Sequence, residues 1–399
     1  MKNSTALRLF ALALALAVPL SQMLSLSVYG QARRVPPEQS QKKNKRTGDG
    51  TEPQEQEPRD IVGRPQEAET VRVEAAIVNV DAVVYNKKTG QVMTNLKKEN
   101  FAIFEDNNRK EITYFSTPEA PITVAMVLEY SRLTEKLGGS YFEPGRYEVL
   151  RPMFYFLSRF VKPPDDYVSV IAYDMRPTPI TDFTNDPARI NQTIDLLLRN
   201  RPASSEANLF DALKLVLVGG RGDSVVLEDS KSETTEYAGL ASLKGRRKAV
   251  LLVSSGVDTF SKINYDEARK IAQNAGVPIY IIGTGNLFFK KYGDYLPPTD
   301  YITGDPGRLT LLQAQNTLNT FAKETGGAYY PVTFEGELPS VLQSINARLR
   351  SLYSLGYPPT TRDGKRHKIT VKVDVDGDGN FDDKEYVVES RQFYNAPKG

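Results

Sequence analysis

The feature that most constrains the fold is a short apolar run inside the stretch PITVAMVLEYSRL, residues 121–133. Its large apolar residues follow closely on one another between Pro121 and the polar group that begins at Glu129. A run this short and this apolar is typical of a strand buried on both faces, as in a parallel sheet covered by helices. Ligands of such sheets bind just beyond the carboxyl ends of the strands. Glu129 and Ser131 are therefore the first candidate site residues.

The chain that follows alternates between apolar strands and amphipathic helices. The pattern predicts strands at 167–173, 249–253, 277–282 and 328–332, and helices at 150–161, 188–198, 209–218, 265–274, 309–325 and 338–352. Repeated strand–helix units with buried strands predict an α/β fold with a doubly wound, mostly parallel, Rossmann-like sheet. Two insertions interrupt the pattern. Residues 221–247 are polar and predict a surface loop, and 287–307 are rich in Gly, Pro and Tyr after a strand end.

Both ends of the folded region alternate with a period of two, which predicts antiparallel strands. Residues 71–84 predict one long strand with a slip near Ile77, and two further strands lie around a turn at 106–108. Near the other end, 368–375 and 386–389 predict a hairpin. Because an isolated two-stranded hairpin is marginally stable, we expect it to pair with the strands of 71–117. The two chain ends then form one small antiparallel β unit.

The N-terminus has the pattern of an export signal. Lys2 and Arg8 precede an apolar core at 9–20, and cleavage is expected after Ala32. An uncleaved anchor is the alternative, since the apolar stretch continues weakly beyond that core. Residues 33–70 contain few large apolar side chains and predict a disordered linker. The expected organisation is a signal peptide (1–32), the linker (33–70), an N-terminal β-strand unit (71–117), an α/β domain (119–357) and a C-terminal β-hairpin (358–399).

Composition excludes several kinds of site. There are 51 basic and 49 acidic residues, a net charge of +2, and the basic residues are scattered, so we expect no nucleic-acid partner. Cysteine is absent, which removes disulfides, thiolate nucleophiles and cysteine zinc sites. The single histidine, His367, leaves a Ser-His-Asp hydrolase one base, and no GxSxG motif accompanies it. We expect a protein that is not an enzyme, is exported to the periplasm, envelope or medium, and has no membrane span after signal cleavage.

An acidic stretch near the C-terminus has the spacing of a twelve-residue calcium loop. Oxygen-bearing side chains occupy loop positions one, three, five, nine and twelve, and glycine occupies position six. The predicted calcium ligands are Asp374, Asp376, Asp378, Asn380, Asp382 and Glu385. Strand-like sequence flanks the loop, so this is not a helix–loop–helix hand. The alternative is a solvated hairpin tip, which Asp and Gly also favour.

Four segments together resemble the von Willebrand factor A (VWFA) domain, and more narrowly the exported VWFA-related family described in acidobacteria. These segments are FAIFED (101–106), VAMVL (124–128), AVLLVSSGVDT (249–259) and YSLGYP (353–358). The resemblance covers roughly residues 71–394. It implies a doubly wound fold and a role in protein–protein interaction or adhesion.

The resemblance also implies a metal-ion-dependent adhesion site, built in that family from Asp-x-Ser-x-Ser, a Thr and a later Asp. The corresponding residues here are Glu129, Ser131, Leu133, Asn208, Ser255 and Asp258. Leu133 has no oxygen to offer, Ser255 stands where an Asp is expected, and Mg²⁺ tolerates little error in geometry. We therefore expect a degenerate site that does not hold Mg²⁺. In the alternative interpretation, Glu129, Ser131 and Asn208 cap helix starts and satisfy loop amides.

The leading functional hypothesis is an exported, non-catalytic protein that binds a protein partner through the loops at the sheet edge. A structural or assembly factor of the cell envelope, working through the β unit, is the main alternative. A hydrolase that uses Glu129, Asp211 and Asp258 as acid and base is the third.

Overall fold

The computed structural model describes residues 77–118, 121–138, 145–223, 234–243, 247–359 and 361–396. The chain divides into two units after Thr70, and all described residues belong to the second unit. The predicted signal peptide, the predicted linker and residues 71–76 of the predicted first strand lie outside the described residues.

The central element is a six-stranded sheet with the order β12-β11-β10-β5-β6-β7. Strand β5 pairs in parallel with β6 and β10, whereas β7 is antiparallel to β6 at one edge. From β7 to β12, with the strands of this sheet numbered along the chain, the order is 3-2-1-4-5-6. This is the strand order of doubly wound dinucleotide-type sheets. The predicted fold class is confirmed. The strands are β5 (Ile122–Glu129), β6 (Tyr167–Tyr173), β7 (Pro177–Thr184), β10 (Arg247–Ser254), β11 (Ile279–Gly283) and β12 (Tyr329–Pro331).

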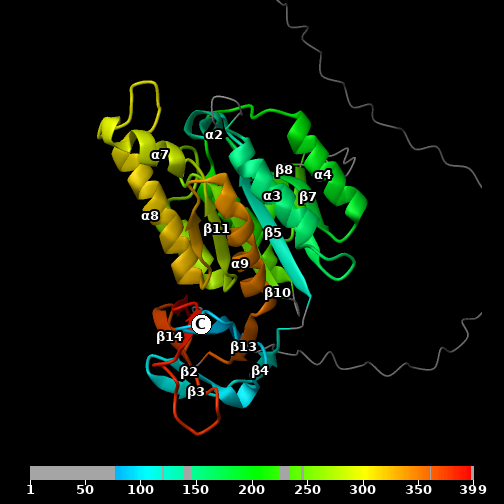
Figure 1. The fold of residues 1–399 in the computed structure, drawn as a ribbon, viewed down its shortest axis with the longest axis vertical. Coiled ribbons are helices and arrows are strands. Elements are labelled where there is room, and N and C mark those ends of the chain that lie inside the picture. The colour runs from blue at the N-terminus through cyan, green and yellow to red at the C-terminus, as the bar shows by residue number, and fades with distance from the viewer. Residues whose placement is uncertain are drawn as a thin grey trace, which may run out of the picture. The chain divides into compact units, whose positions relative to one another are not determined.

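Strand β5 lies at the centre of the sheet, and every one of its residues is buried. Successive side chains of a strand point to opposite faces. Val124 and Met126 pack into one apolar core with α3 and α9, while Ala125 and Val127 pack into a second core with α5, α6 and α8. Figure 1 shows helices on both sides of the sheet. The prediction of a strand buried on both faces is confirmed.

The six predicted helices begin and end close to where the sequence places them, whereas two short helices, at 132–137 and 286–292, were not predicted. Asp186 caps α4 by accepting a hydrogen bond from the backbone N–H of Ala188, and Gly276 ends α6 in the left-handed conformation. The α-helices are α2 (Arg132–Leu137), α3 (Tyr147–Arg159), α4 (Pro187–Arg199), α5 (Leu209–Val218), α6 (Tyr265–Ala275), α7 (Asn286–Tyr292), α8 (Arg308–Thr325) and α9 (Leu338–Arg350). Short 3₁₀ helices occupy η1 (Lys98–Asn100), η2 (Leu240–Ser242), η3 (Gly293–Tyr295) and η4 (Glu335–Glu337).

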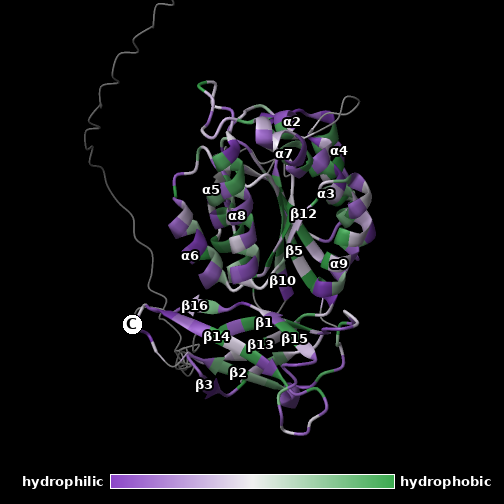
Figure 2. Ribbon diagram, turned by 60° about the vertical axis from the view of Figure 1, so that its left-hand side comes forward, coloured by the Kyte–Doolittle hydropathy of each residue, from purple (hydrophilic) through white to green (hydrophobic). Residues whose placement is uncertain are grey.

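The antiparallel strands form two four-stranded sheets, with the orders β15-β1-β13-β4 and β16-β14-β2-β3. Both sheets contribute to one apolar core, in which Val80, Ile103 and Tyr353 are completely buried. Figure 2 shows strands of the two sheets close together, among them β1, β13, β14 and β2. The strands are β1 (Val78–Asn86), β2 (Phe101–Glu105), β3 (Asn108–Lys110), β4 (Tyr114–Ser116), β13 (Tyr353–Tyr357), β14 (Arg366–Val373), β15 (Tyr386–Ser390) and β16 (Phe393–Asn395). Segments from both ends of the described chain thus build this β unit.

Two strand pairings differ from the sequence expectation. Instead of pairing with each other, β14 pairs with β2 and β15 pairs with β1, because the acidic loop between them carries the chain from one sheet to the other. Likewise, β3 pairs with β2, whereas β4 joins β13 in the opposite sheet. The turn itself is as predicted. Asp106 and Asn107 both have positive φ angles, as a two-residue hairpin turn requires.

The insertion at 221–247 is not simply a surface loop. Strand β8 (Gly220–Asp223) pairs with β9 (Thr234–Tyr237), and Tyr237 is buried with its hydroxyl 2.7 Å from the Ser169 hydroxyl. The expectation was wrong for these ends because Tyr237 and Leu240 anchor the insertion in the apolar core. Residues 224–233 and 244–246 lie outside the described residues.

Candidate functional site

The carboxyl ends of β5 and β10 lie side by side at the centre of the sheet. These are the first and fourth strands in chain order, and the order of the sheet reverses between them. In open α/β sheets this switch point is where ligands bind. Glu129 is the last residue of β5, Ser254 is the last residue of β10, and Ser255 follows it.

Hydrogen bonds from serine residues surround the Glu129 carboxylate, which is completely buried. Its Oε2 accepts from the backbone N–H of Ser255 (2.7 Å), from the Ser255 hydroxyl (2.8 Å) and from the Ser254 hydroxyl (3.1 Å). Its Oε1 accepts from the hydroxyls of Ser255 (3.1 Å) and Ser131 (3.3 Å). Both oxygens are therefore satisfied from within the protein.

Burial raises the pKa of Glu129, although the hydrogen bonds from Ser255, Ser254 and Ser131 lower it in part. The Tyr173 hydroxyl donates to Ser254 (2.8 Å) and extends the network below the carboxylate. Over the described ranges, no set of three acidic or histidine side chains that includes Glu129 lies close enough to hold a metal ion. Hydroxyl and amide groups are the direct hydrogen-bond partners of this carboxylate.

Ser131 and Leu133 complete this end of β5. The Ser131 hydroxyl accepts a hydrogen bond from the backbone N–H of Leu133 (3.2 Å) and so caps α2. The Leu133 side chain is buried in an apolar cluster with Leu137, Val257 and Leu311. The position that lacks an oxygen therefore belongs to the core.

Asn208 and Asp258 form a separate network at the start of α5. Asp258 accepts hydrogen bonds from the backbone N–H groups of Leu209 (2.9 Å) and Phe210 (3.2 Å), and Asn208 accepts one from Ser261 (3.0 Å). Burial raises the pKa of Asp258, against the lowering effect of these donors. No hydrogen bond joins this group to Glu129 in the part of the chain that the structure describes. The expected site residues thus fall into two groups, Glu129 with Ser131 and Ser255, and Asn208 with Asp258.

The acidic loop between β14 and β15 is held by its own carboxylates. Asp374 accepts hydrogen bonds from the backbone N–H groups of Gly377 (2.7 Å) and Gly379 (2.9 Å), and Asp382 accepts one from Val375 (2.7 Å). Gly377 and Gly379 have φ angles of +77° and +90°, which L-residues with side chains rarely adopt. The predicted sharp turn is present.

Three of the predicted calcium ligands lie together. One carboxylate oxygen from each of Asp374, Asp376 and Asp382 lies within 4.8 Å of the others. Asp378 and Glu385 are not part of this group, and Asp378 instead accepts hydrogen bonds from Asn380. A backbone hydrogen bond from Asp378 lowers the pKa of Asp376, but desolvation and the carboxylates of Asp378 and Asp382 raise it more. Carboxylate oxygens at this spacing match the ligand type that Ca²⁺ prefers.

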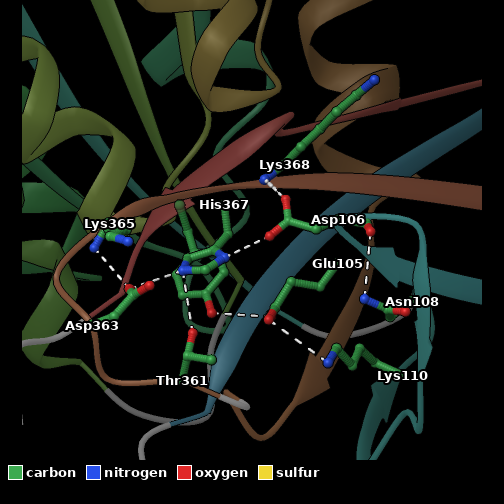
Figure 3. Close-up of polar contacts among 10 residues, drawn as sticks. Glu105, Asp106, Asn108, Lys110, Thr361, Asp363, Lys365, His367 and Lys368 are labelled. Carbon is green, nitrogen blue, oxygen red and sulfur yellow. Dashed lines mark hydrogen bonds and ion pairs between the residues drawn. The ribbon is translucent and has the colours of Figure 1, made fainter.

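His367, the single histidine of the chain, bridges two carboxylates (Figure 3). Its Nδ1 lies 2.7 Å from Asp106 Oδ2 and its Nε2 lies 3.0 Å from Asp363 Oδ1. Hydrogen bonds to Asp363 and Asp106 raise the pKa of His367. Only the imidazolium form can donate from both ring nitrogens to these carboxylates, so the two pairs favour that form. The Thr361 hydroxyl lies 3.2 Å from the same Nε2.

Exposed apolar residues in the segments that follow the parallel strands were not predicted from the sequence. Seven large apolar residues are exposed in the segments that follow these strands, which include α7 and η3, namely Met175, Phe260, Tyr292, Tyr295, Tyr301, Ile302 and Phe334. Tyr295 is 85% exposed and Ile302 is completely exposed. Figure 1 shows α7 and the loop that follows it at the same end of the sheet as α2. The Tyr-rich composition of 287–307 was the available signal, but exposure follows only from the fold.

Comparison with known proteins gives likenesses of fold at low identity. No protein-family model and no curated protein sequence matches the chain. An aerotolerance-related membrane protein from Bacteroides fragilis aligns with a TM-score of 0.37 and 13% identity, over 58% of this chain and 98% of that one. Proximal thread matrix protein 1 from the mussel byssus aligns at 0.38 and 14%, over 61% and 49%, so this chain spans about half of its length. The PilB minor pilin from Streptococcus sanguinis aligns at 0.39 and 12%, over 58% and 62%.

Among the residues that the structure describes, no helix is both long enough and apolar enough to span a bilayer.

Proposed function

We propose that this protein is an exported, non-catalytic, VWFA-related interaction protein that binds a protein partner through the carboxyl-edge loops of its parallel sheet. The observation that carries the proposal is the group of seven exposed apolar residues on those loops, defined above and called here the apolar edge. Aromatic residues and Met are enriched in protein interfaces.

The proposal includes a degenerate adhesion site at Glu129. In support, both carboxylate oxygens already accept hydrogen bonds from serine hydroxyls and an amide, and Leu133 lies in the core. A magnesium ion demands near-ideal octahedral oxygen geometry and would have to displace those donors. We infer that the Glu129 carboxylate joins the ends of β5 and β10 through its hydrogen bonds, at the place where a working adhesion site would hold an ion.

We also propose that the acidic loop binds Ca²⁺. The three clustered carboxylates of Asp374, Asp376 and Asp382 would be the first ligands, with Asp378, Asn380 and Glu385 completing the set. The fit rests on oxygen chemistry and on the turn at Gly379, which matches position six of a calcium loop. When bound, the ion would supply countercharge and would fix the loop that links the two β sheets.

The non-catalytic part of the proposal rests on how the candidate acids are used. Asp211 accepts hydrogen bonds from the backbone N–H groups of Lys262 (3.0 Å) and Ile263 (3.3 Å), just as Asp258 does from α5. Glu129 is enclosed by serine donors, and His367 is paired with two carboxylates. Each of these four candidate groups already has hydrogen-bond or ion-pair partners within the protein.

The apolar edge can be tested with site-specific photo-crosslinking in native envelopes. A crosslinker at Tyr295 should trap a defined partner, and Tyr295→Ser/Ile302→Ser should remove partner capture without changing the unfolding temperature, because both side chains are exposed. The matched control is Phe154→Ser/Val218→Ser, which removes exposed apolar side chains from α3 and α5. Equal capture by the test and control variants contradicts the proposal. Trapping from Tyr114 in β4 but not from Tyr295 would favour the envelope assembly factor.

A further inference from the structure

A basic hollow lies beside the carboxyl edge, between the start of α2, the start of α3 and the loop that follows α4. It has a volume of about 640 Å³. Its lining residues are Arg132, Glu135, Lys136, Arg146, Arg201, Pro202 and Ser205. Arg132 directly follows Ser131, which is hydrogen-bonded to Glu129, so the hollow adjoins the end of β5.

The charges around this hollow do not balance, because four cationic side chains face a single lining carboxylate. Arg146 pairs with Glu135 (3.1 Å), and Lys136 pairs with Asp305. Arg132 and Arg201 have no carboxylate partner within the described ranges. Arg132 Nε donates instead to the backbone carbonyl of Pro202 (3.4 Å). Two guanidinium groups therefore remain available at the surface.

The backbone around the hollow adds to its positive potential and holds its shape. Arg146 stands at the N-terminus of the thirteen-residue helix α3, which has no side-chain cap. That helix end carries a partial positive charge. The opposite wall is fixed to β5 and α2, because the Tyr130 hydroxyl donates to the carbonyls of Leu197 (2.8 Å) and Asn200 (2.6 Å) and the Arg132 N–H donates to Ser204 (2.6 Å).

We propose that this basic hollow binds carboxylate side chains of an acidic segment in the protein partner, directly through Arg132 and Arg201 and without a bridging metal ion. A guanidinium group presents a planar fork of N–H donors that matches a carboxylate with two hydrogen bonds. An acidic polypeptide fits better than a polyanion such as nucleic acid, because the chain as a whole carries only +2. The hollow is also linked to the apolar edge, since Lys136 pairs with Asp305 in the loop that holds the exposed Tyr301 and Ile302. The inference rests on the proposed interaction function and names the chemistry of the partner.

The test measures binding of a fluorescent oligoglutamate peptide to the purified chain by anisotropy, in buffer that contains EDTA. We expect binding that weakens as salt is added, since exposed charges are screened. Arg132→Gln/Arg201→Gln should lower the affinity by roughly tenfold. The matched control, Lys88→Gln/Arg362→Gln, makes the same change in net charge at exposed residues of the β unit and should change the affinity by less than about twofold.

Two further variants sharpen the result. Arg201 is exposed and has no bonded partner within the described ranges, so Arg201→Gln alone should fold normally and still weaken binding. Arg132→Lys/Arg201→Lys keeps the charge but loses the fork, and we expect it to bind less tightly than the wild type. Equal loss in the Lys88/Arg362 control, or binding that appears only with Mg²⁺ or Ca²⁺, overturns the inference. Inorganic phosphate that competes as well as oligoglutamate at equal ionic strength also overturns it, by revealing a general anion site.

The experiment also separates this inference from the proposed function. If the crosslinker at Tyr295 traps a partner but oligoglutamate does not bind, the apolar edge stands and the acidic partner is wrong. If oligoglutamate binds at Arg132 and Arg201 but no partner is trapped, the hollow is a carboxylate-binding site and the proposed partner site at the apolar edge is wrong.

Discussion

Two regions of this protein gather carboxylate oxygens, and they do so in opposite surroundings. At the carboxyl edge of the parallel sheet, Glu129 is buried, and serine donors satisfy both of its oxygens. In the loop between β14 and β15, Asp374, Asp376 and Asp382 lie within 4.8 Å of one another close to solvent, and the nearby carboxylates raise the pKa of Asp376. One region encloses a single buried carboxylate with donors, whereas the other gathers several carboxylates near solvent, whose donors are mostly backbone N–H groups of the same loop.

The comparison teaches that the surroundings of a carboxylate, more than its presence, decide whether a cation is needed. A buried carboxylate must find donors or become protonated, because desolvation disfavours its charge. An exposed cluster keeps its charge in water and remains open to a hard cation. The motif match at the edge and the motif match in the loop therefore lead to different proposals.

The largest expected effect is at Glu129, because its removal leaves several buried donors without an acceptor. Glu129→Ala should lower the free energy of unfolding by about 3 kcal/mol, measured by urea denaturation. The matched control is Asp195→Ala, which removes an exposed carboxylate from α4 and should change stability by less than about 0.5 kcal/mol. Equal stability of the two variants would contradict the contrast between the two carboxylate regions, since Glu129 would then not stabilise the fold.

The next effect concerns the acidic loop and is seen only when calcium is added. Titration calorimetry should give a dissociation constant on the order of 10⁻⁴–10⁻³ M, typical of extracellular modules, and Asp374→Ala should abolish the heat. Asp383→Ala is the matched control, because Asp383 lies in the same loop but pairs with Lys372 (2.7 Å). Without calcium, Asp374→Ala should change the free energy of unfolding by less than about 1 kcal/mol. An absence of heat in the wild type would end the calcium proposal.

A smaller effect is expected in the pH dependence of Glu129. Burial raises its pKa in the folded state above the ordinary 4.5, so between the unfolded and folded pKa values the folded protein binds more protons. Its contribution to stability therefore falls as pH rises through that interval. Relative to Glu129→Gln, which does not titrate, the wild type should be more stable near pH 4.5 than near pH 8. The opposite slope in urea denaturation would mean that the serine donors outweigh burial.

The smallest effect is expected at His367, which is paired with carboxylates near the surface. Its raised pKa means that the stabilisation is complete below the ordinary value of about 6.5 and is lost as pH rises through the folded pKa. A backbone hydrogen bond from Lys368 lowers the pKa of Asp106, and the hydrogen bond with His367 lowers that of Asp363, so their contribution is lost only in acid. The destabilisation caused by His367→Gln should be larger near pH 5.5 than near pH 9. A pH-independent difference in unfolding temperature would exclude the ion pairs.

Much of the fold follows from local pattern. The apolar run at 121–133 predicts a strand buried on both faces, and the structure makes it the centre of the sheet. Helix ends are equally local, since Gly276 ends α6 where a glycine in the left-handed conformation is favoured. The pairing of β14 and β15 with different sheets could not be predicted, because their partners β2 and β1 lie far away in the chain and meet them only when the shared core packs.

The candidate site divides in the same way. The sequence by itself determined which residues stand at the ends of β5 and β10 and which oxygens line the acidic loop, because those facts depend on strand periodicity and spacing. Only the tertiary structure decided that Ser254 and Ser255 enclose Glu129, that His367 joins Asp106 to Asp363, and that Arg132 and Arg201 face the same hollow. The physical reason is that hydrogen bonds and ion pairs act over a few ångströms in space, and residues far apart in the chain reach that distance only when the core has packed.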